Sequence, residues 1–267
     1  MIDLQRIVPL NPGGIATPLF CVHGGSGSAY SYLELAWQLG ADRPVYGIEA
    51  PGFDGDREPV RSLPALSAEY VDTLREFRPS GDFSLLGWSL GGVIALDMAR
   101  RLTAAGARVR QVVLVDASVP KAAAQLPPEK EIARRFLLDT LATVEASPAV
   151  LNRVLAGHPT AGAEELFAAA EKTGALPAEL DADLMAKRYA VFKAHVEASY
   201  GFEVAEPYDG PVLHLVASES PARYTHWAKV ATNLTEQTVP GDHYSMWTGN
   251  SLLRLAGLAR AALAAAE

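Results

Sequence analysis

Two kinds of hydrophobic pattern alternate along both ends of the chain. Short apolar runs bounded by turn residues predict buried strands at 18–22, 45–48, 83–86, 110–115, 211–217 and 235–239. Apolar positions at helical spacing predict helices at 30–39, 65–77, 93–102, 224–230 and 251–265. A further run at 4–10 predicts an edge strand, because Pro9 lacks the N–H that a central strand needs. Strands that alternate with helices of this length predict an α/β fold with a mostly parallel, doubly wound sheet.

The pattern changes between residues 119 and 206, where strand-like runs give way to helical ones. Helices are predicted at 129–144, 149–155, 163–172 and 180–200, with prolines between or at the start of them. We therefore expect a core built from 1–118 and 207–267, and a helical insertion at 119–206 that covers the site as a lid. The alternative is a helical decoration far from the chemistry.

Composition and charge narrow the classes of protein that the chain can belong to. Its 267 residues are 49% hydrophobic and 20% charged, which suits one α/β domain with an inserted part. A formal net charge of −8 argues against nucleic acid or an anionic membrane as partners. The one cysteine, Cys21, lies in a buried run and has no disulfide partner, which fits a reducing compartment. With no signal-like start and no apolar run of membrane length, we expect a cytoplasmic protein, and no Cys/His spacing predicts a metal.

The stretch 87–92, Gly-Trp-Ser-Leu-Gly-Gly, lies between a predicted strand and a predicted helix. Strand, G-x-S-x-G and helix together predict a nucleophile elbow with Ser89 as nucleophile. Gly87 and Gly91 leave room where a side chain would clash, while Trp88 fills the variable position. Ser89 then precedes a helix N-terminus, where free N–H groups favour a developing oxyanion.

Two more positions complete a Ser–acid–His order. Asp116 ends the strand after the elbow, and His243 lies in a turn after the last predicted strand, which is the order of α/β-hydrolases. In that arrangement His243 takes the serine proton and Asp116 orients the imidazole. Glu219 and Asp242 are competing acids, and strand-end geometry favours Asp116 over both.

A glycine-rich loop at 23–27 follows an early strand, where this fold type places its second oxyanion donor. We assign the two donors to the backbone N–H groups of Gly25 and Leu90. His23 is interpreted as a brace for the loop, with a catalytic base as the alternative. The other histidines are taken as structural or exposed: His158, His195, His214 and His226.

On these residues the chain resembles the type I thioesterase domains that release the products of nonribosomal peptide synthetases. The resemblance covers nearly the whole chain and rests on residues 18–25, 87–92, 114–117 and 241–243. In that family the acid follows the strand after the elbow and a helical lid follows the acid, which fits Asp116 and residues 119–206. The loop departs from the family pattern, because many relatives carry one or two prolines where this chain has His23-Gly24-Gly25.

The resemblance implies a two-step reaction without a cofactor. A peptidyl chain, carried as a thioester on the phosphopantetheine arm of a carrier protein, is transferred to Ser89 and then released by water or by an internal nucleophile. It also implies an acyl or peptidyl carrier protein as partner, and a monomer. Whether release is hydrolytic or cyclising, and whether the chain is an excised domain or a stand-alone protein, stays open.

Three rival functions share the predicted fold. A stand-alone type II editing thioesterase carries the same triad but usually a smaller lid and a His or Tyr in place of Trp88. A general carboxylesterase or lipase would cleave simple esters faster than thioesters. A non-catalytic hydrolase-fold binding protein typically loses a triad member, whereas Ser89, Asp116 and His243 are all present here.

Overall fold

The structure is a computed structural model that describes residues 6–119, 125–143, 148–158, 161–174, 176, 180–200, 202–204, 206–220 and 226–267. Within this part of the chain the elements alternate between strands and helices on either side of a purely helical stretch. The predicted α/β class with an inserted helical region is confirmed.

The described strands form a seven-stranded sheet in the order β1-β3-β2-β4-β5-β6-β7. All neighbouring strands are parallel except the edge strand β1, which pairs antiparallel with β3. The strand bounds are β1 Ile7–Asn11, β2 Leu19–Val22, β3 Val45–Ile48, β4 Phe83–Trp88, β5 Val109–Val115, β6 Tyr208–Ala217 and β7 Ala231–Val239.

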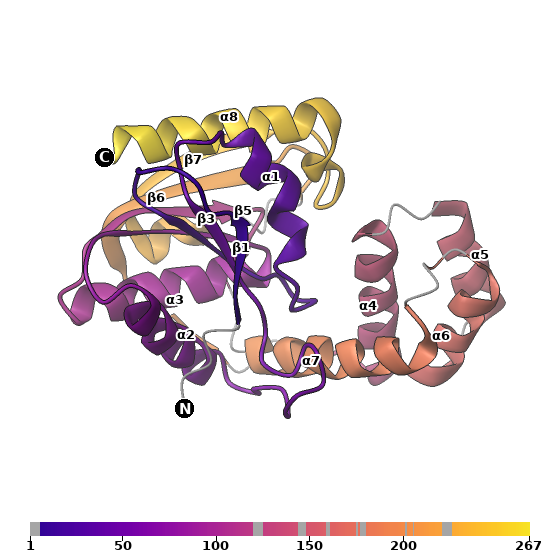
Figure 1. The fold of residues 1–267 in the computed structure, drawn as a ribbon. Coiled ribbons are helices and arrows are strands. Elements are labelled where there is room, and N and C mark those ends of the chain that lie inside the picture. Colours follow the sequence, from indigo (N-terminus) through magenta and orange to yellow (C-terminus); the bar gives the residue numbers. More distant parts are fainter. Residues whose placement is uncertain are drawn as a thin grey trace.

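Helices cover both faces of this sheet, as Figure 1 shows. Helices α1 (Leu33–Gln38) and α8 (Gly249–Ala265) lie on one face, and α2 (Leu63–Phe77) and α3 (Leu90–Ala104) lie on the other. The start of α2 is fixed locally, because the Ser62 side chain accepts a hydrogen bond from the Ala65 N–H at 3.4 Å and Pro64 follows the cap. Each face has its own buried core, with Phe20 and Leu85 on the α2–α3 side and Cys21 and Leu86 on the other. Alternate residues of one strand thus point to opposite faces, as a sheet buried on both sides requires.

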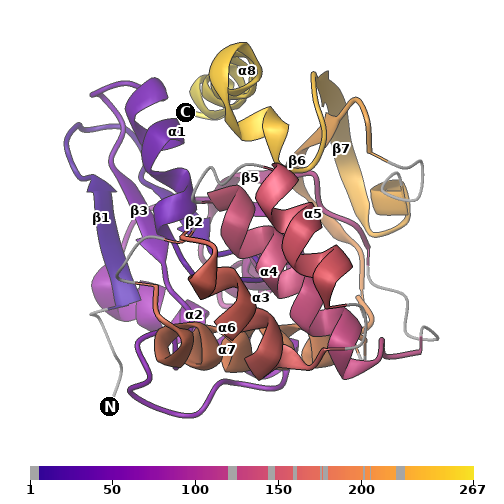
Figure 2. The ribbon, with the colours of Figure 1, turned by 90° about the vertical axis from the view of Figure 1, so that its right-hand side faces the viewer.

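The insertion between β5 and β6 contains α4 (Glu129–Thr143), α5 (Pro148–Gly157), α6 (Ala163–Lys172) and α7 (Ala182–Tyr200). In Figure 2 the helices α4, α5 and α6 lie in front of the sheet, with α7 running beneath them. The insertion has a hydrophobic cluster of its own, centred on Phe136, Phe167 and Tyr189, whose rings lie 5.4–5.6 Å apart. The far end of α7 belongs to the sheet instead, because Ala198 is part of the α2–α3 core. Helix α7 therefore joins the two parts.

Some sequence-based predictions of elements need correction. The helix predicted at 224–230 is, within the described residues, a short 3-10 turn at His226–Lys229. Its apolar positions reflect burial against the sheet: Trp227 is fully buried and its indole N–H donates to the Ala117 carbonyl at 2.8 Å. Strand β7 begins four residues before the predicted strand, because its outer residues are polar and give no alternating pattern. Residues 4 and 5 of the edge strand predicted at 4–10 lie outside the described residues.

Candidate active site

The carboxyl ends of four parallel strands meet at one edge of the sheet. Register pairs Val22 with Gly87, Trp88 with Val115, and Val115 with Leu215, so the residues that follow these strands become neighbours. Chemistry in open parallel sheets collects at this edge.

Ser89 lies in the sharp turn between β4 and α3. Its backbone has φ 55° and ψ −120°, a region that non-glycine residues rarely adopt, and its N–H donates to the Val115 carbonyl at 2.9 Å. A Cβ at Gly87 would lie 2.0 Å from the Gly91 carbonyl oxygen, and one at Gly91 would lie 2.4 Å from that of Val22. Both glycines are therefore required by space, as the elbow prediction demands.

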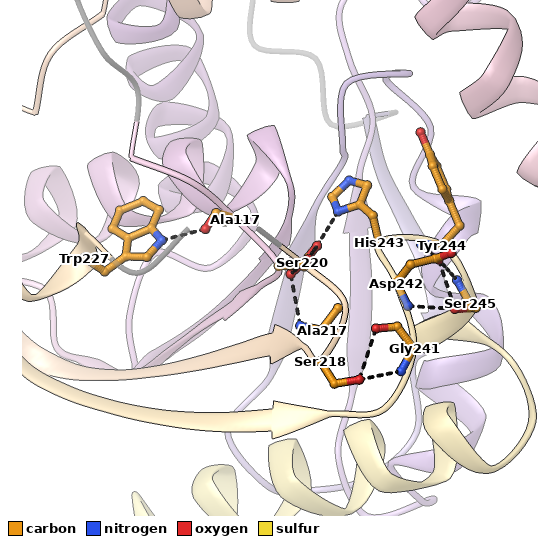
Figure 3. Close-up of polar contacts among 11 residues, drawn as sticks. Ala117, Ala217, Ser218, Ser220, Trp227, Gly241, Asp242, His243, Tyr244 and Ser245 are labelled. Carbon is orange, nitrogen blue, oxygen red and sulfur yellow. Dashed lines mark hydrogen bonds and ion pairs between the residues drawn. The ribbon is translucent and has the colours of Figure 1, made fainter. Parts of the chain in front are cut away.

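Asp116 and His243 are held together by a hydrogen bond. His243 Nδ1 lies 2.6 Å from Asp116 Oδ2, and Asp116 itself is fully buried. The carboxylate also accepts hydrogen bonds from the Ser220 hydroxyl, at 2.7 and 2.8 Å, and from the Ala217 N–H at 3.0 Å (Figure 3). Burial alone raises the pKa of Asp116, but the hydrogen bonds from His243, Ser220 and Ala217 outweigh burial and hold that pKa below its usual value. Asp116 is thus built to stay ionised beside the imidazole.

Among the described contacts, neither competing acid makes a side-chain hydrogen bond with His243. Asp242 Oδ1 accepts hydrogen bonds from the Tyr244 and Ser245 N–H groups, at 2.9 and 2.8 Å, and so caps the turn that carries His243 (Figure 3). The side chain of Glu219 is exposed, and its backbone N–H donates to the Gly241 carbonyl at 3.0 Å. Of the three acids, Asp116 is the one that contacts His243.

Aromatic side chains pack around His243. The Trp88 ring centroid lies 4.9 Å from that of His243, and the Tyr244 and Trp247 rings stand edge-on to Trp88 at 5.9 and 5.4 Å. The backbone N–H of Trp88 donates to the Tyr32 hydroxyl at 3.0 Å, which fixes the end of β4. Trp88 therefore limits where the imidazole can turn.

The glycine loop at 23–27 is braced by two stacked histidines. His23 and His195 lie with ring centroids 4.9 Å apart, and His195 Nδ1 lies 2.9 Å from the Gly25 carbonyl, to which it donates. His23 Nδ1 donates to the Gly24 carbonyl at 2.7 Å, which leaves Nε2 to accept from the Tyr70 hydroxyl at 2.6 Å. Burial lowers the pKa of His23 to about 3, with the nearby His195 acting in the same direction. With both nitrogens occupied and the ring neutral, His23 braces the loop, in line with its interpretation from sequence.

Helix α7 contacts the same loop. A Cβ at Gly25 would lie 3.1 Å from Phe192 Cε2, so the α7 side chain packs directly against that glycine. His195 comes from α7 as well and is fully buried. The inserted helices therefore reach the residues that precede the elbow.

Two residues at this edge, Ser220 and Asp139, were not predicted from the sequence, and His195, expected to be structural or exposed, is a buried structural residue. Ser220 and His195 reach Asp116 and Gly25 only through pairings more than 100 residues apart in the chain. Asp139 left a local signal, because it continues the buried stripe of Ile132 and Phe136 on α4 as an acid at an apolar position. Two arginines of the insertion also have partners: Arg134 donates to the Leu155 carbonyl at 2.8 Å, and Arg188 lies 4.7 Å over the Phe53 ring.

The arrangement offers an imidazole oriented by Asp116 and packed on Trp88, the residue before a strained serine, which is suited to acyl transfer. Among the residues that the structure describes, no group of three or more His, Cys, Asp or Glu side chains could hold a metal ion. In the same part of the chain, we find no helix with the length and apolarity that a bilayer crossing needs.

Comparisons with known proteins agree with this geometry. The thioesterase domain family matches residues 17–261. The dimodular nonribosomal peptide synthase of Bacillus subtilis is 38% identical over 114 residues, which are 43% of this chain and 5% of that protein. The thioesterase pytI of Aspergillus terreus is 35% identical over 153 residues, 52% of this chain and 48% of that protein. The matched residues are thus a small part of the synthetase and about half of the fungal thioesterase.

A solved structure extends the likeness over almost the full length. The NocB thioesterase domain of the nocardicin cluster, in a covalent complex with a fluorophosphonate nocardicin G analogue, has a TM-score of 0.70 and 25% identity. The match covers 97% of this chain and 99% of that one. Together with the Asp116–His243 pair at the strand ends, a match over residues 17–261 identifies the family. The chain belongs to the thioesterase domain family.

Proposed function

We propose that this chain is a serine thioesterase that takes a peptidyl chain from a carrier-protein phosphopantetheine thioester onto Ser89 and releases it. The observation that carries the proposal is the Asp116–His243 hydrogen bond of 2.6 Å beside the elbow. Two relatives support it, since one is a nonribosomal peptide synthase and the NocB domain binds a fluorophosphonate nocardicin G analogue covalently.

In the first step Ser89 Oγ attacks the thioester carbonyl. His243 takes the serine proton at Nε2, because Nδ1 is occupied by Asp116. The N–H groups of Leu90 and Gly25 would bind the oxyanion, and Leu90 is the first residue of α3, where N–H groups have no acceptor within the helix. When the C–S bond breaks, His243 returns the proton to the departing thiolate and leaves an ester on Ser89.

In the second step the ester is cleaved by water or by a nucleophile within the acyl chain. His243 accepts the proton of the attacking group and returns it to Ser89 Oγ as the ester bond breaks. Water gives a free acid, and an internal amine or hydroxyl gives a macrocycle. The insertion supports a role as a lid, because His195 and Phe192 of α7 contact the Gly25 loop.

Intact-protein mass spectrometry tests the proposal. The full chain is mixed with a peptidyl N-acetylcysteamine thioester, which presents the same thioester group as the carrier arm, and Ser89→Ala is treated in parallel. We expect an acyl adduct and a released product with the wild type, and neither with Ser89→Ala. A product lighter by one water than the free acid identifies cyclisation.

The match to the thioesterase pytI gives a second candidate, a stand-alone editing thioesterase. The matched residues are 48% of pytI, whereas they are 5% of the Bacillus subtilis synthase. Turnover of short acyl-carrier thioesters with none of the peptidyl ones would favour editing. Cleavage of simple esters with no reaction on any thioester would refute both thioesterase roles.

A further inference from the structure

An acidic side chain from the insertion lies buried beside the reaction centre. Asp139 is on α4, one turn beyond Phe136, and is 8% exposed. Its neighbours along the same face of the helix, Ile132 and Phe136, are 1% exposed and belong to the core of the insertion. A carboxyl group at such a position is costly unless its oxygens are paired.

The Asp139 carboxyl group contacts the turn that carries His243 and the glycine loop at 23–27. It makes hydrogen bonds with the side chains of Tyr244 and Ser26. The Tyr244 ring stands edge-on to His243 at 5.2 Å, and Ser26 follows Gly25 in the loop that is assigned an oxyanion donor. Figure 3 shows Tyr244 beside His243, with its hydroxyl pointing away from Asp242.

One oxygen of this carboxyl group lacks a partner. Asp139 Oδ2 is buried and makes no hydrogen bond to any described residue. Burial raises the pKa of Asp139 to about 6, although the charge of His243 and the hydrogen bonds from Tyr244 and Ser26 act in the opposite direction. Within the described chain no lysine or arginine forms an ion pair with Asp139. The site therefore holds a carboxyl group with two neutral donors and one buried, unpaired oxygen.

We propose that Asp139 is a specificity-determining residue that selects acyl chains with a protonated amine on the residue attached to Ser89. The inference rests on the proposed function, since it names the substrate class of the same site. An ammonium group is the ligand that fits, because it donates a hydrogen bond to the unpaired Asp139 Oδ2 and neutralises the charge of the carboxylate. A neutral alkyl side chain in the same place leaves the carboxylate unpaired.

Pairs of substrates isolate the contribution of the side-chain amine. The probes are Nα-acetyl N-acetylcysteamine thioesters of 2,4-diaminobutyrate, ornithine and lysine, each beside the alkyl amino acid that lacks the terminal nitrogen, 2-aminobutyrate, norvaline or norleucine. The free acid is the product counted, so that lactams formed spontaneously by the amine probes do not contribute. The three side chains place the amine at different distances from the ester on Ser89. Since a hydrogen bond to a charged group is worth about 1.5–3 kcal/mol, we expect kcat/KM to favour at least one amine about tenfold or more. Acetylation of that side-chain amine should abolish the preference.

Variants then assign the preference to Asp139. In Asp139→Asn the preference should fall to about twofold or less, because turnover of the amine substrate falls further than turnover of the alkyl substrate. Glu131→Gln is the control, because this exposed acid on the same helix pairs with Arg135 on the surface and should leave the preference unchanged.

Several outcomes contradict the inference. Equal or lower wild-type turnover of all three amines, compared with the alkyl substrates, overturns it, and this measurement does not depend on whether Asp139→Asn folds. If Asp139→Asn lowers kcat/KM equally for the amine and the alkyl thioesters, the role of Asp139 is merely structural. Failure of the proposed function is distinct: the wild type then forms no ester on Ser89 with any of the six thioesters.

Discussion

Ser220 should matter to activity although sequence motifs do not mark it. Its hydroxyl donates to both oxygens of Asp116, at 2.7 and 2.8 Å, and so shares the carboxylate with His243 and the Ala217 N–H. Ser220→Ala removes one of these three donors and adds no bulk. The remaining two still hold the carboxylate, so we expect an impaired site in a folded protein.

The size of the effect follows from the hydrogen bond that is lost. Bonds to a charged group contribute about 1.5–3 kcal/mol, and Ser220 is half-buried, so water can partly replace its hydroxyl. We therefore expect the lower end, about 1.5 kcal/mol. If the transition state with its imidazolium loses that amount, kcat/KM falls roughly tenfold.

The pH dependence of activity and of stability provides a second test of Ser220→Ala. The pKa of Asp116 lies below its usual value in the folded state, so ionised Asp116 stabilises the fold above that usual value. This contribution is lost as the pH falls through the folded-state pKa. Loss of the Ser220 donor raises the folded-state pKa of Asp116, so the acid side of the profiles for kcat/KM and for unfolding free energy should move to higher pH.

The assay is thioester hydrolysis and urea unfolding from pH 2.5 to 8, a range that extends below the usual pKa of Asp116. Ser199→Ala is the matched control, because this hydroxyl donates to the Val196 carbonyl at 2.7 Å and touches no carboxylate. If Ser220→Ala keeps kcat/KM within twofold of the wild type and its acid limb does not move, the role assigned to this hydrogen bond is refuted.

Two further predictions concern the elbow and the loop beside it. Gly91→Ala places a Cβ 2.4 Å from the Val22 carbonyl oxygen and 2.5 Å from that of His23. We therefore expect thermal unfolding to show a loss of about 3 kcal/mol or more in the free energy of unfolding. The control is Gly257→Ala, which has open space around it and should leave that free energy unchanged. His195→Phe keeps a flat ring on His23 but removes the donor to the Gly25 carbonyl, so kcat should fall about tenfold with KM little changed. Because burial lowers the pKa of His195 to about 4, this loss should be constant above pH 5, and a loss that varies with pH there would contradict a neutral brace.

Much of the sheet could be predicted because its strands are buried on both faces. Continuous apolar runs such as Val112–Val115 stand out from their surroundings, and turn residues mark their ends. The elbow was predictable for a related reason, since Gly87 and Gly91 are demanded by local space. Where a strand lies at the edge with polar residues outward, as β7 does, the signal fades and its start was missed.

The candidate site was only partly accessible from the sequence. Asp116 and His243 could be proposed as partners from their places after strands, and the structure has them in contact. The choice of Asp116 over Asp242 depends on geometry, because Asp242 turns its carboxylate to the N–H groups of Tyr244 and Ser245. The catalytic roles of Ser89, Gly25 and Leu90 stay predictions.

Helix α7 has a mechanical consequence for the enzyme. Its first half packs in the hydrophobic cluster of the insertion through Met185 and Tyr189, and its last turns pack on the sheet through Ala198. Between them, Phe192 and His195 press on Gly25. Because α7 contacts the insertion, the sheet core and the Gly25 loop, a displacement of the insertion relative to the sheet would also disturb that loop. Under the proposed function, the position of the lid and the position of the Gly25 N–H would therefore be linked.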